Sequence, residues 1–181
     1  MTDTPPTLQR PRREQLREIG LFGGLSDEAL DQLTQELHAA FLGAGVDVTR
    51  EGEHAREMFV VLSGELEVVR LSKGGHEGRV AILGPGSWFG EMSIVDVQPR
   101  SATVRTVAPS MLLKVTAEDL DRLYRRDMKS YLLLVLNIAR ELSRRLRVAD
   151  GMIATFLSSM WDAHMGPASR RPSASDEDRG G

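Results

Sequence analysis

The strongest constraint on the fold is a series of short apolar runs, separated by glycines, between residues 39 and 116. In residues 66–68 and 104–107, apolar and polar side chains roughly alternate, as on a β-strand with one buried face. About eight such runs follow one another at even spacing, which is typical of antiparallel sandwiches and barrels. The sequence therefore predicts an α+β fold in which residues 39–116 form an eight-stranded antiparallel β jelly-roll barrel.

Helical patterns flank this strand region on both sides. Residues 14–38 predict two N-terminal helices, of which the second has Ser26 as its N-cap and acidic residues in its first turn. Residues 117–165 predict C-terminal helices, beginning with one that Thr116 caps and continuing with a long one. The longer helices are thus expected before and after the β-region.

Both ends of the chain are expected to be disordered. Residues 1–13 are rich in Pro, Thr and Arg, which do not form a packed element here. Residues 166–181 begin with the helix-ending pair Gly166-Pro167 and contain few apolar side chains.

The long C-terminal helix carries an unbroken heptad seam. Apolar side chains recur along it in alternating steps of four and three residues: Met128, Leu132, Val135, Ala139, Leu142, Leu146, Ala149, Ile153, Phe156 and Met160. Such a helix is longer than a small domain is wide, so we expect residues 128–160 to pair with a second copy in a homodimer. The alternative is that the stripe packs only on the chain's own barrel.

Composition excludes several functional classes. The chain has no cysteine, which excludes disulfides, Cys-ligated metal sites and thiol catalysis, and its four histidines are scattered. The net charge of −3 provides no basic field that would hold nucleic acid without sequence preference. Neither a signal peptide nor an apolar run long enough to span a bilayer is present, so we expect a cytoplasmic protein without a membrane partner, metal or cofactor.

The most informative stretch covers residues 84–104. Gly90 permits a tight turn, and residues 91–95 can form one helical turn whose first amides point outward as an anion site. Arg100 can fold back over this turn, and a guanidinium beside such amides makes a phosphate cradle. Glu91 only accepts hydrogen bonds, so it suits hydroxyl groups; a ligand with one phosphate and a neighbouring ribose hydroxyl satisfies both residues. The alternative is a buried Glu91–Arg100 ion pair that only shapes the loop.

Two segments of this stretch resemble a known motif. Phe-Gly-Glu-Met-Ser at 89–93, followed by Pro-Arg-Ser-Ala-Thr-Val at 99–104, is similar to the phosphate-binding cassette of cyclic nucleotide-binding domains. That family includes the bacterial catabolite activator protein, the regulatory subunits of protein kinase A and cyclic-nucleotide-gated channels. The resemblance covers about residues 14–150 and extends to residues 21–26, 51–53, 59–64 and 137–146.

The resemblance implies roles for individual residues. Glu91 would accept the ribose 2′-hydroxyl, Arg100 would pair with the cyclic phosphate, and Ser101 would add a hydroxyl. The amides of Gly90 and Ala102 would donate to the ribose–phosphate end of the ligand. The implied ligand-binding set is Gly90, Glu91, Met92, Ser93, Arg100, Ser101 and Ala102. The base would be covered by the long helix, with Arg140, Arg144, Arg145 and Asp150 as candidates, unless these belong to a solvated helix face.

Several positions depart from the family's pattern without removing Glu91 or Arg100. Ala55-Arg56 stands where Gly-Asp is frequent, Val97 where a turn glycine is common, and Ser93 where alanine is common. In the family, a threonine at the position of Ser101 tends to accompany a preference for cGMP. The serine at position 101 therefore favours cAMP as the ligand and does not exclude cGMP.

These observations favour a stand-alone cyclic nucleotide sensor that relays ligand binding through its C-terminal helix to an unidentified protein effector. After Trp161 the sequence has no room for a helix-turn-helix, so direct DNA binding is not expected. No nucleophile–base pair stands out, so enzymatic activity is not expected either. The alternatives are a ligand-independent interaction or scaffold protein with a degenerate cassette, and a regulator like the catabolite activator protein that acts through a partner.

Overall fold

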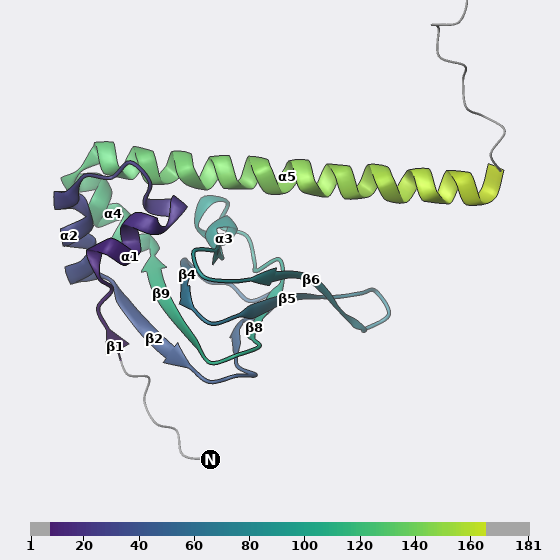
Figure 1. Ribbon diagram of the computed structural model, residues 1–181, viewed down its shortest axis with the longest axis horizontal. Coiled ribbons are helices and arrows are strands. Elements are labelled where there is room, and N and C mark those ends of the chain that lie inside the picture. The colour runs from purple at the N-terminus through teal and green to yellow at the C-terminus, as the bar shows by residue number, and fades with distance from the viewer. Residues whose placement is uncertain (1–7, 166–181) are drawn as a thin grey trace, which may run out of the picture. The chain divides into compact units, whose positions relative to one another are not determined.

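The computed structural model describes residues 8–165, which form two β-sheets and a set of helices (Figure 1). By its contacts the chain divides into two compact units, residues 1–139 and 140–181. The helices are α1 (Arg13–Glu18), η1 (Gly20–Phe22), α2 (Asp27–Glu36), α3 (Glu91–Val95), α4 (Ala117–Arg126) and α5 (Met128–Met165). The predicted disordered tail at 166–181 lies outside the described residues, as do residues 1–7.

Within residues 8–165, nine strands form two antiparallel sheets. The five-stranded sheet has the order β1-β2-β9-β4-β7, with strands Leu8–Gln9, His38–Leu42, Ser110–Thr116, Glu57–Ser63 and Trp88–Phe89. The four-stranded sheet has the order β3-β8-β5-β6, with strands Asp47–Thr49, Thr103–Thr106, Leu66–Leu71 and Glu77–Leu83. All their pairings are antiparallel, as the alternating pattern indicated.

Two details of the predicted β-region are wrong. The sheets are not closed into an eight-stranded barrel, because no ladder joins one sheet to the other in residues 8–165. The edge strands β3 and β7 have three and two residues, too few backbone groups to close a barrel. In addition, part of the segment expected to be disordered at 1–13 forms β1, which pairs with β2 through backbone hydrogen bonds that composition does not reveal.

One hydrophobic core cluster lies between the two sheets. Val61, Phe89 and Leu112 from the five-stranded sheet pack with Leu66 and Val104 from the four-stranded sheet. The Phe89 ring also stacks on that of Phe59, with ring centroids 5.4 Å apart. Because Phe89 immediately precedes Gly90, this core fixes the strand from which the predicted cassette starts.

Helices α1, α2 and α4 gather at one end of the sheets in Figure 1. The predicted caps are confirmed: the Ser26 hydroxyl accepts a hydrogen bond from the Ala29 amide, and Thr116 forms a capping box with Asp119. In the first unit, α5 buries Leu134 and Ile138. In residues 8–165, no helix combines the length and the hydropathy needed to cross a bilayer.

One buried amide joins the start of α5 to the N-terminal helical segment. The Asn137 Nδ2 donates to the carbonyl oxygens of Leu21 and Gly23, at 3.1 and 2.9 Å. The Leu21 carbonyl lies in η1 and the Gly23 carbonyl directly follows it, so neither takes part in the hydrogen bonds within α2. The Asn137 side chain on α5 thus satisfies two backbone carbonyls of the N-terminal segment that would otherwise be unpaired.

We predict that Asn137→Asp lowers the free energy of unfolding by about 2–4 kcal/mol, because a carboxylate repels both carbonyls and cannot donate to them. Urea denaturation followed by circular dichroism measures the change. Gln35→Glu makes the same chemical substitution at an exposed position and is expected to cost about 0.5 kcal/mol or less. A loss at 137 no larger than the loss at 35 would show that this contact does not hold the segments together.

Candidate functional site

The predicted cassette begins at a left-handed glycine. Gly90 follows β7, has a φ of 85° and is the N-cap of α3. This region of φ is readily accessible only to glycine. A Cβ added to Gly90 would lie 2.3 Å from the Arg100 Nη1 and 3.0 Å from the Glu57 carbonyl oxygen. Gly90 therefore provides both the turn into α3 and the space that the Arg100 side chain occupies.

Arg100 folds back over the turn, as the sequence predicted. Its Nη1 donates to the Gly90 carbonyl oxygen at 3.1 Å and to the Ser93 hydroxyl at 3.3 Å. Its backbone is anchored in the loop between β3 and β4, where its amide donates to the Glu53 carbonyl at 2.8 Å and its carbonyl accepts from the Gly52 amide at 2.9 Å. The residue is 5% exposed, so a full guanidinium charge is held inside the protein.

Three acidic residues balance this buried charge. Burial lowers the pKa of Arg100, and the charges of Glu57, Glu53 and Glu91 act in the opposite direction. The ion-pair partner that the structure shows for Arg100 is Glu57, whose Oε1 lies 3.7 Å from the Arg100 Nη2. Glu57 was not among the predicted site residues. In the sequence, Glu57 could have been noticed because it stands at the start of a strand, directly before the apolar run 58–62.

The structure brings together four of the seven predicted ligand-binding residues. Glu91 and Ser93 are each 2% exposed and lie with Gly90 and Arg100 in the same buried turn.

The remaining three predicted residues lie nearer the surface. Met92 and Ser101 are exposed, with 4.0 Å between the Met92 sulfur and the Ser101 hydroxyl, while Ala102 is half-buried. A carboxylate and a guanidinium are thus buried within one short turn, with a hydroxyl and a thioether at its surface.

The predicted base-covering residues belong to the second compact unit. Arg140, Arg144 and Arg145 all lie on α5. Arg144 pairs with Glu141, and the Arg145 Nε lies 3.1 Å from the Glu141 Oε1. Their role toward a base stays a prediction.

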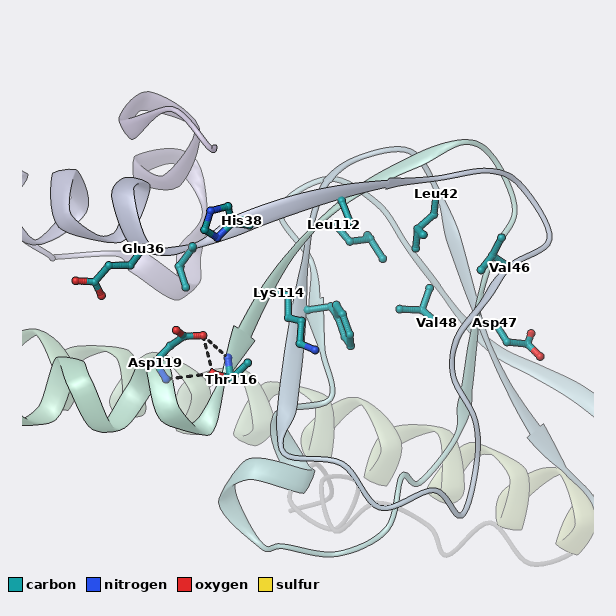
Figure 2. A pocket seen from close by; sticks show the side chains of 13 residues that line it. Glu36, His38, Leu42, Val46, Asp47, Val48, Leu112, Lys114, Thr116 and Asp119 are labelled. Atoms are coloured by element: carbon teal, nitrogen blue, oxygen red, sulfur yellow. Dashed lines mark hydrogen bonds between the residues drawn. The ribbon is translucent and has the colours of Figure 1, made fainter. Parts of the chain in front are cut away.

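A separate cavity of about 430 Å³ lies between β2, β3, β4 and β9 (Figure 2). Apolar side chains such as Leu42, Val48 and Leu112 form much of its wall, and none of the predicted ligand-binding residues lines it. One of its charged lining residues, Lys114, is linked to the cassette through Glu57. The Lys114 Nζ lies 3.1 Å from the Glu57 Oε2, and Glu57 is the ion-pair partner of Arg100. In residues 8–165, no group of three metal-ligating side chains is placed to hold a metal ion.

Comparison with known proteins agrees with this geometry. Residues 41–127 match the sequence model of the cyclic nucleotide-binding domain. Residues 41–127 are therefore a cyclic nucleotide-binding domain similar to that of the catabolite activator protein.

Three similar proteins illustrate the range of relatives. The cyclic AMP receptor protein of Thermus thermophilus is 36% identical over 130 residues, which are 72% of this chain and 58% of the relative. The regulatory domain of Toxoplasma gondii PKA, solved with cAMP, is 29% identical with a TM-score of 0.56, over 61% of this chain and 42% of that one. A cyclic nucleotide-binding domain from Methylobacillus flagellatus shares the fold, with a TM-score of 0.71 over 78% of this chain and 80% of that one, at 24% identity.

The chain spans about three fifths of the length of two curated relatives: 58% of the Thermus protein and 62% of a Mycobacterium tuberculosis cAMP-activated transcriptional regulator. The comparison thus concerns only a part of each of those proteins.

Val97, one of the departures from the family's pattern, has a left-handed backbone with a φ of 52°. A β-branched residue is strained there by about 1–2 kcal/mol, and glycine would regain part of that strain after its larger unfolded-state entropy is counted. We therefore predict that Val97→Gly raises the free energy of unfolding by about 0.5–1 kcal/mol.

Chemical denaturation measures this change, with Val95→Gly as the matched control. Val95 and Val97 are both 60% exposed, but Val95 is helical, so its replacement should cost about 0.5–1 kcal/mol. If Val97→Gly is as destabilising as Val95→Gly, the positive φ is not a source of strain.

Proposed function

We propose that this chain is a cyclic nucleotide sensor that binds its ligand at the cassette of residues 90–102, with a preference for cAMP over cGMP. The observation that carries the proposal is the buried Arg100, oriented by Gly90 and Ser93 within the same turn as the buried Glu91. The family membership and the cAMP named for its relatives support the same ligand class.

The chemistry of the two side chains matches the two ends of such a ligand. The cyclic phosphodiester carries one negative charge, which a guanidinium neutralises through charge-assisted hydrogen bonds. The Glu91 carboxylate accepts the 2′-hydroxyl and is not satisfied by a bare phosphate. Gly90 and Ala102 supply backbone amides to the ribose–phosphate end, and Met92, Ser93 and Ser101 complete the wall. A ligand that combines an anionic ring and a free hydroxyl uses the cassette fully.

We predict that Arg100→Ala weakens cAMP binding by about 100-fold or more and Glu91→Ala by about tenfold or more, because each leaves one end of the ligand without its partner. Isothermal titration calorimetry measures both, and thermal melts verify that the variants fold. Arg125→Ala and Glu65→Ala remove the same charges at exposed positions outside the cassette and should leave binding unchanged. Wild-type affinity in either cassette variant would refute its assigned role.

The same titration separates the sensor from its alternatives. No binding of cAMP, cGMP or a cyclic dinucleotide to the wild-type chain would favour a ligand-independent interaction protein. A DNA mobility shift with and without cAMP addresses a transcriptional role, which the name of the Mycobacterium tuberculosis relative gives for that protein.

We further propose that the heptad seam of α5 joins two copies and that the dimer passes the ligand signal on to a protein effector. In the first unit the seam does not face the chain's own core: Leu132 is 57% exposed, whereas Leu134, two residues away, is 1% exposed. In the second unit Ile153, Phe156 and Met160 continue the seam and are exposed as well. A stripe of large apolar side chains on one helix is stabilised when it packs against a partner helix.

We predict that the double change Ile153→Glu and Phe156→Glu converts a dimer into a monomer, because four like charges would face one another across the paired seam. Size-exclusion chromatography with light scattering gives the mass directly. Ser158→Glu adds a charge at an exposed position of the same helix but off the seam, so that variant should remain dimeric. A wild-type chain that stays monomeric at high micromolar concentration would refute pairing through the seam.

A further inference from the structure

Three charged side chains form a row from the cavity wall to the cassette. The Lys114 Nζ lies 3.1 Å from the Glu57 Oε2, and the Glu57 Oε1 lies 3.7 Å from the Arg100 Nη2. Lys114 and Glu57 come from the adjacent strands β9 and β4, where Lys114 is opposite Phe59 and Glu57 is opposite Thr116. The two are therefore diagonal neighbours on one face of the sheet, the arrangement in which long side chains reach each other.

Arg100 uses its two terminal nitrogens differently. Nη1 already donates to Gly90 and Ser93, which orient the guanidinium. Nη2 is buried and makes no hydrogen bond within residues 8–165; its nearest anionic partner is the Glu57 carboxylate, beyond hydrogen-bond distance. Nη2 is therefore a donor that these hydrogen bonds leave unused, on the side where Glu57 already lies.

We propose that Glu57 competes with the ligand's anionic group for Arg100, and that Lys114 sets the strength of this competition. The proposal rests on the proposed function, in which Arg100 binds the cyclic phosphate. Two anions cannot share one guanidinium without repulsion, so binding requires that Glu57 give up part of its interaction with Arg100. Lys114 offers Glu57 another cation, and its half-exposed side chain can follow the carboxylate.

This competition lowers the affinity of the site for simple anions. Inorganic phosphate gains the interactions with Arg100 and the backbone amides and is opposed by Glu57. A cyclic nucleotide also gains the hydroxyl interaction at Glu91, so it overcomes the same opposition. Glu57 is thus a specificity-determining residue: it lowers the affinity for all anions and excludes those that bind through charge alone.

The test compares wild type, Glu57→Gln, Lys114→Gln and the double variant, each titrated with cAMP and with inorganic phosphate by calorimetry. Glu57→Gln should bind cAMP about three- to tenfold more tightly and should bind phosphate at concentrations where the wild type does not. Lys114→Gln should bind cAMP about two- to threefold more weakly, because Glu57 then has only Arg100 as a partner. In the double variant the effect of the lysine change should shrink, as expected for coupled residues.

Matched controls separate this effect from net charge. Glu65→Gln removes a carboxylate beyond the far end of β4, about 20 Å along the strand, and Lys73→Gln removes an exposed ammonium in the turn between β5 and β6. Both should bind cAMP as the wild type does. Adding Arg100→Ala to Glu57→Gln should abolish the gain, and thermal melts establish that each variant is folded.

Each outcome decides between the two proposals. Wild-type or weaker cAMP binding by folded Glu57→Gln would overturn the competition and make Glu57 a positioning residue for Arg100. If no variant binds cAMP but Glu57→Gln binds phosphate through Arg100, the competition holds and the proposed ligand is wrong. If no variant binds either anion, both proposals are wrong.

Discussion

The structure of the cassette depends on keeping one guanidinium charge away from water. A buried charge is costly unless hydrogen bonds and opposite charges surround it, and Arg100 has both: two acceptors within the turn and three acidic residues near it. The supporting groups come from segments distant in sequence, because its backbone pairs with Gly52 and Glu53 while its ion-pair partner begins β4. The turn, the β3–β4 loop and the strand are therefore held together by the requirements of one side chain.

Much of this arrangement could be predicted from residue order alone. Gly90, Glu91, Ser93 and Arg100 stand close in sequence, and the geometry of one turn dictates that they meet. The helix caps at Ser26 and Thr116 could also be predicted, because each cap forms between residues that are close in sequence. Glu57 could not be identified in this way, because its approach to Arg100 depends on how β4 lies beside the turn. The short strand β1 and the open sheets were missed since two-residue pairings have no periodicity.

The departures from the family's pattern acquire physical meaning in the structure. Val97 occupies a backbone region that suits glycine, so the sequence difference corresponds to local strain beside the binding turn. Ser93, which stands where alanine is common, provides a hydroxyl that accepts from Arg100. The first change costs stability and the second adds a hydrogen bond. Both act on the conformation of the turn without altering the two charged groups on which ligand chemistry depends.

The open architecture has a mechanical consequence. β7, before the cassette, is the last strand of one sheet, and β8, after it, belongs to the other. In a closed barrel, any movement of such a connection would have to break ladder hydrogen bonds. In residues 8–165 no ladder joins the two sheets, so a movement of one sheet relative to the other would break no ladder hydrogen bond between them.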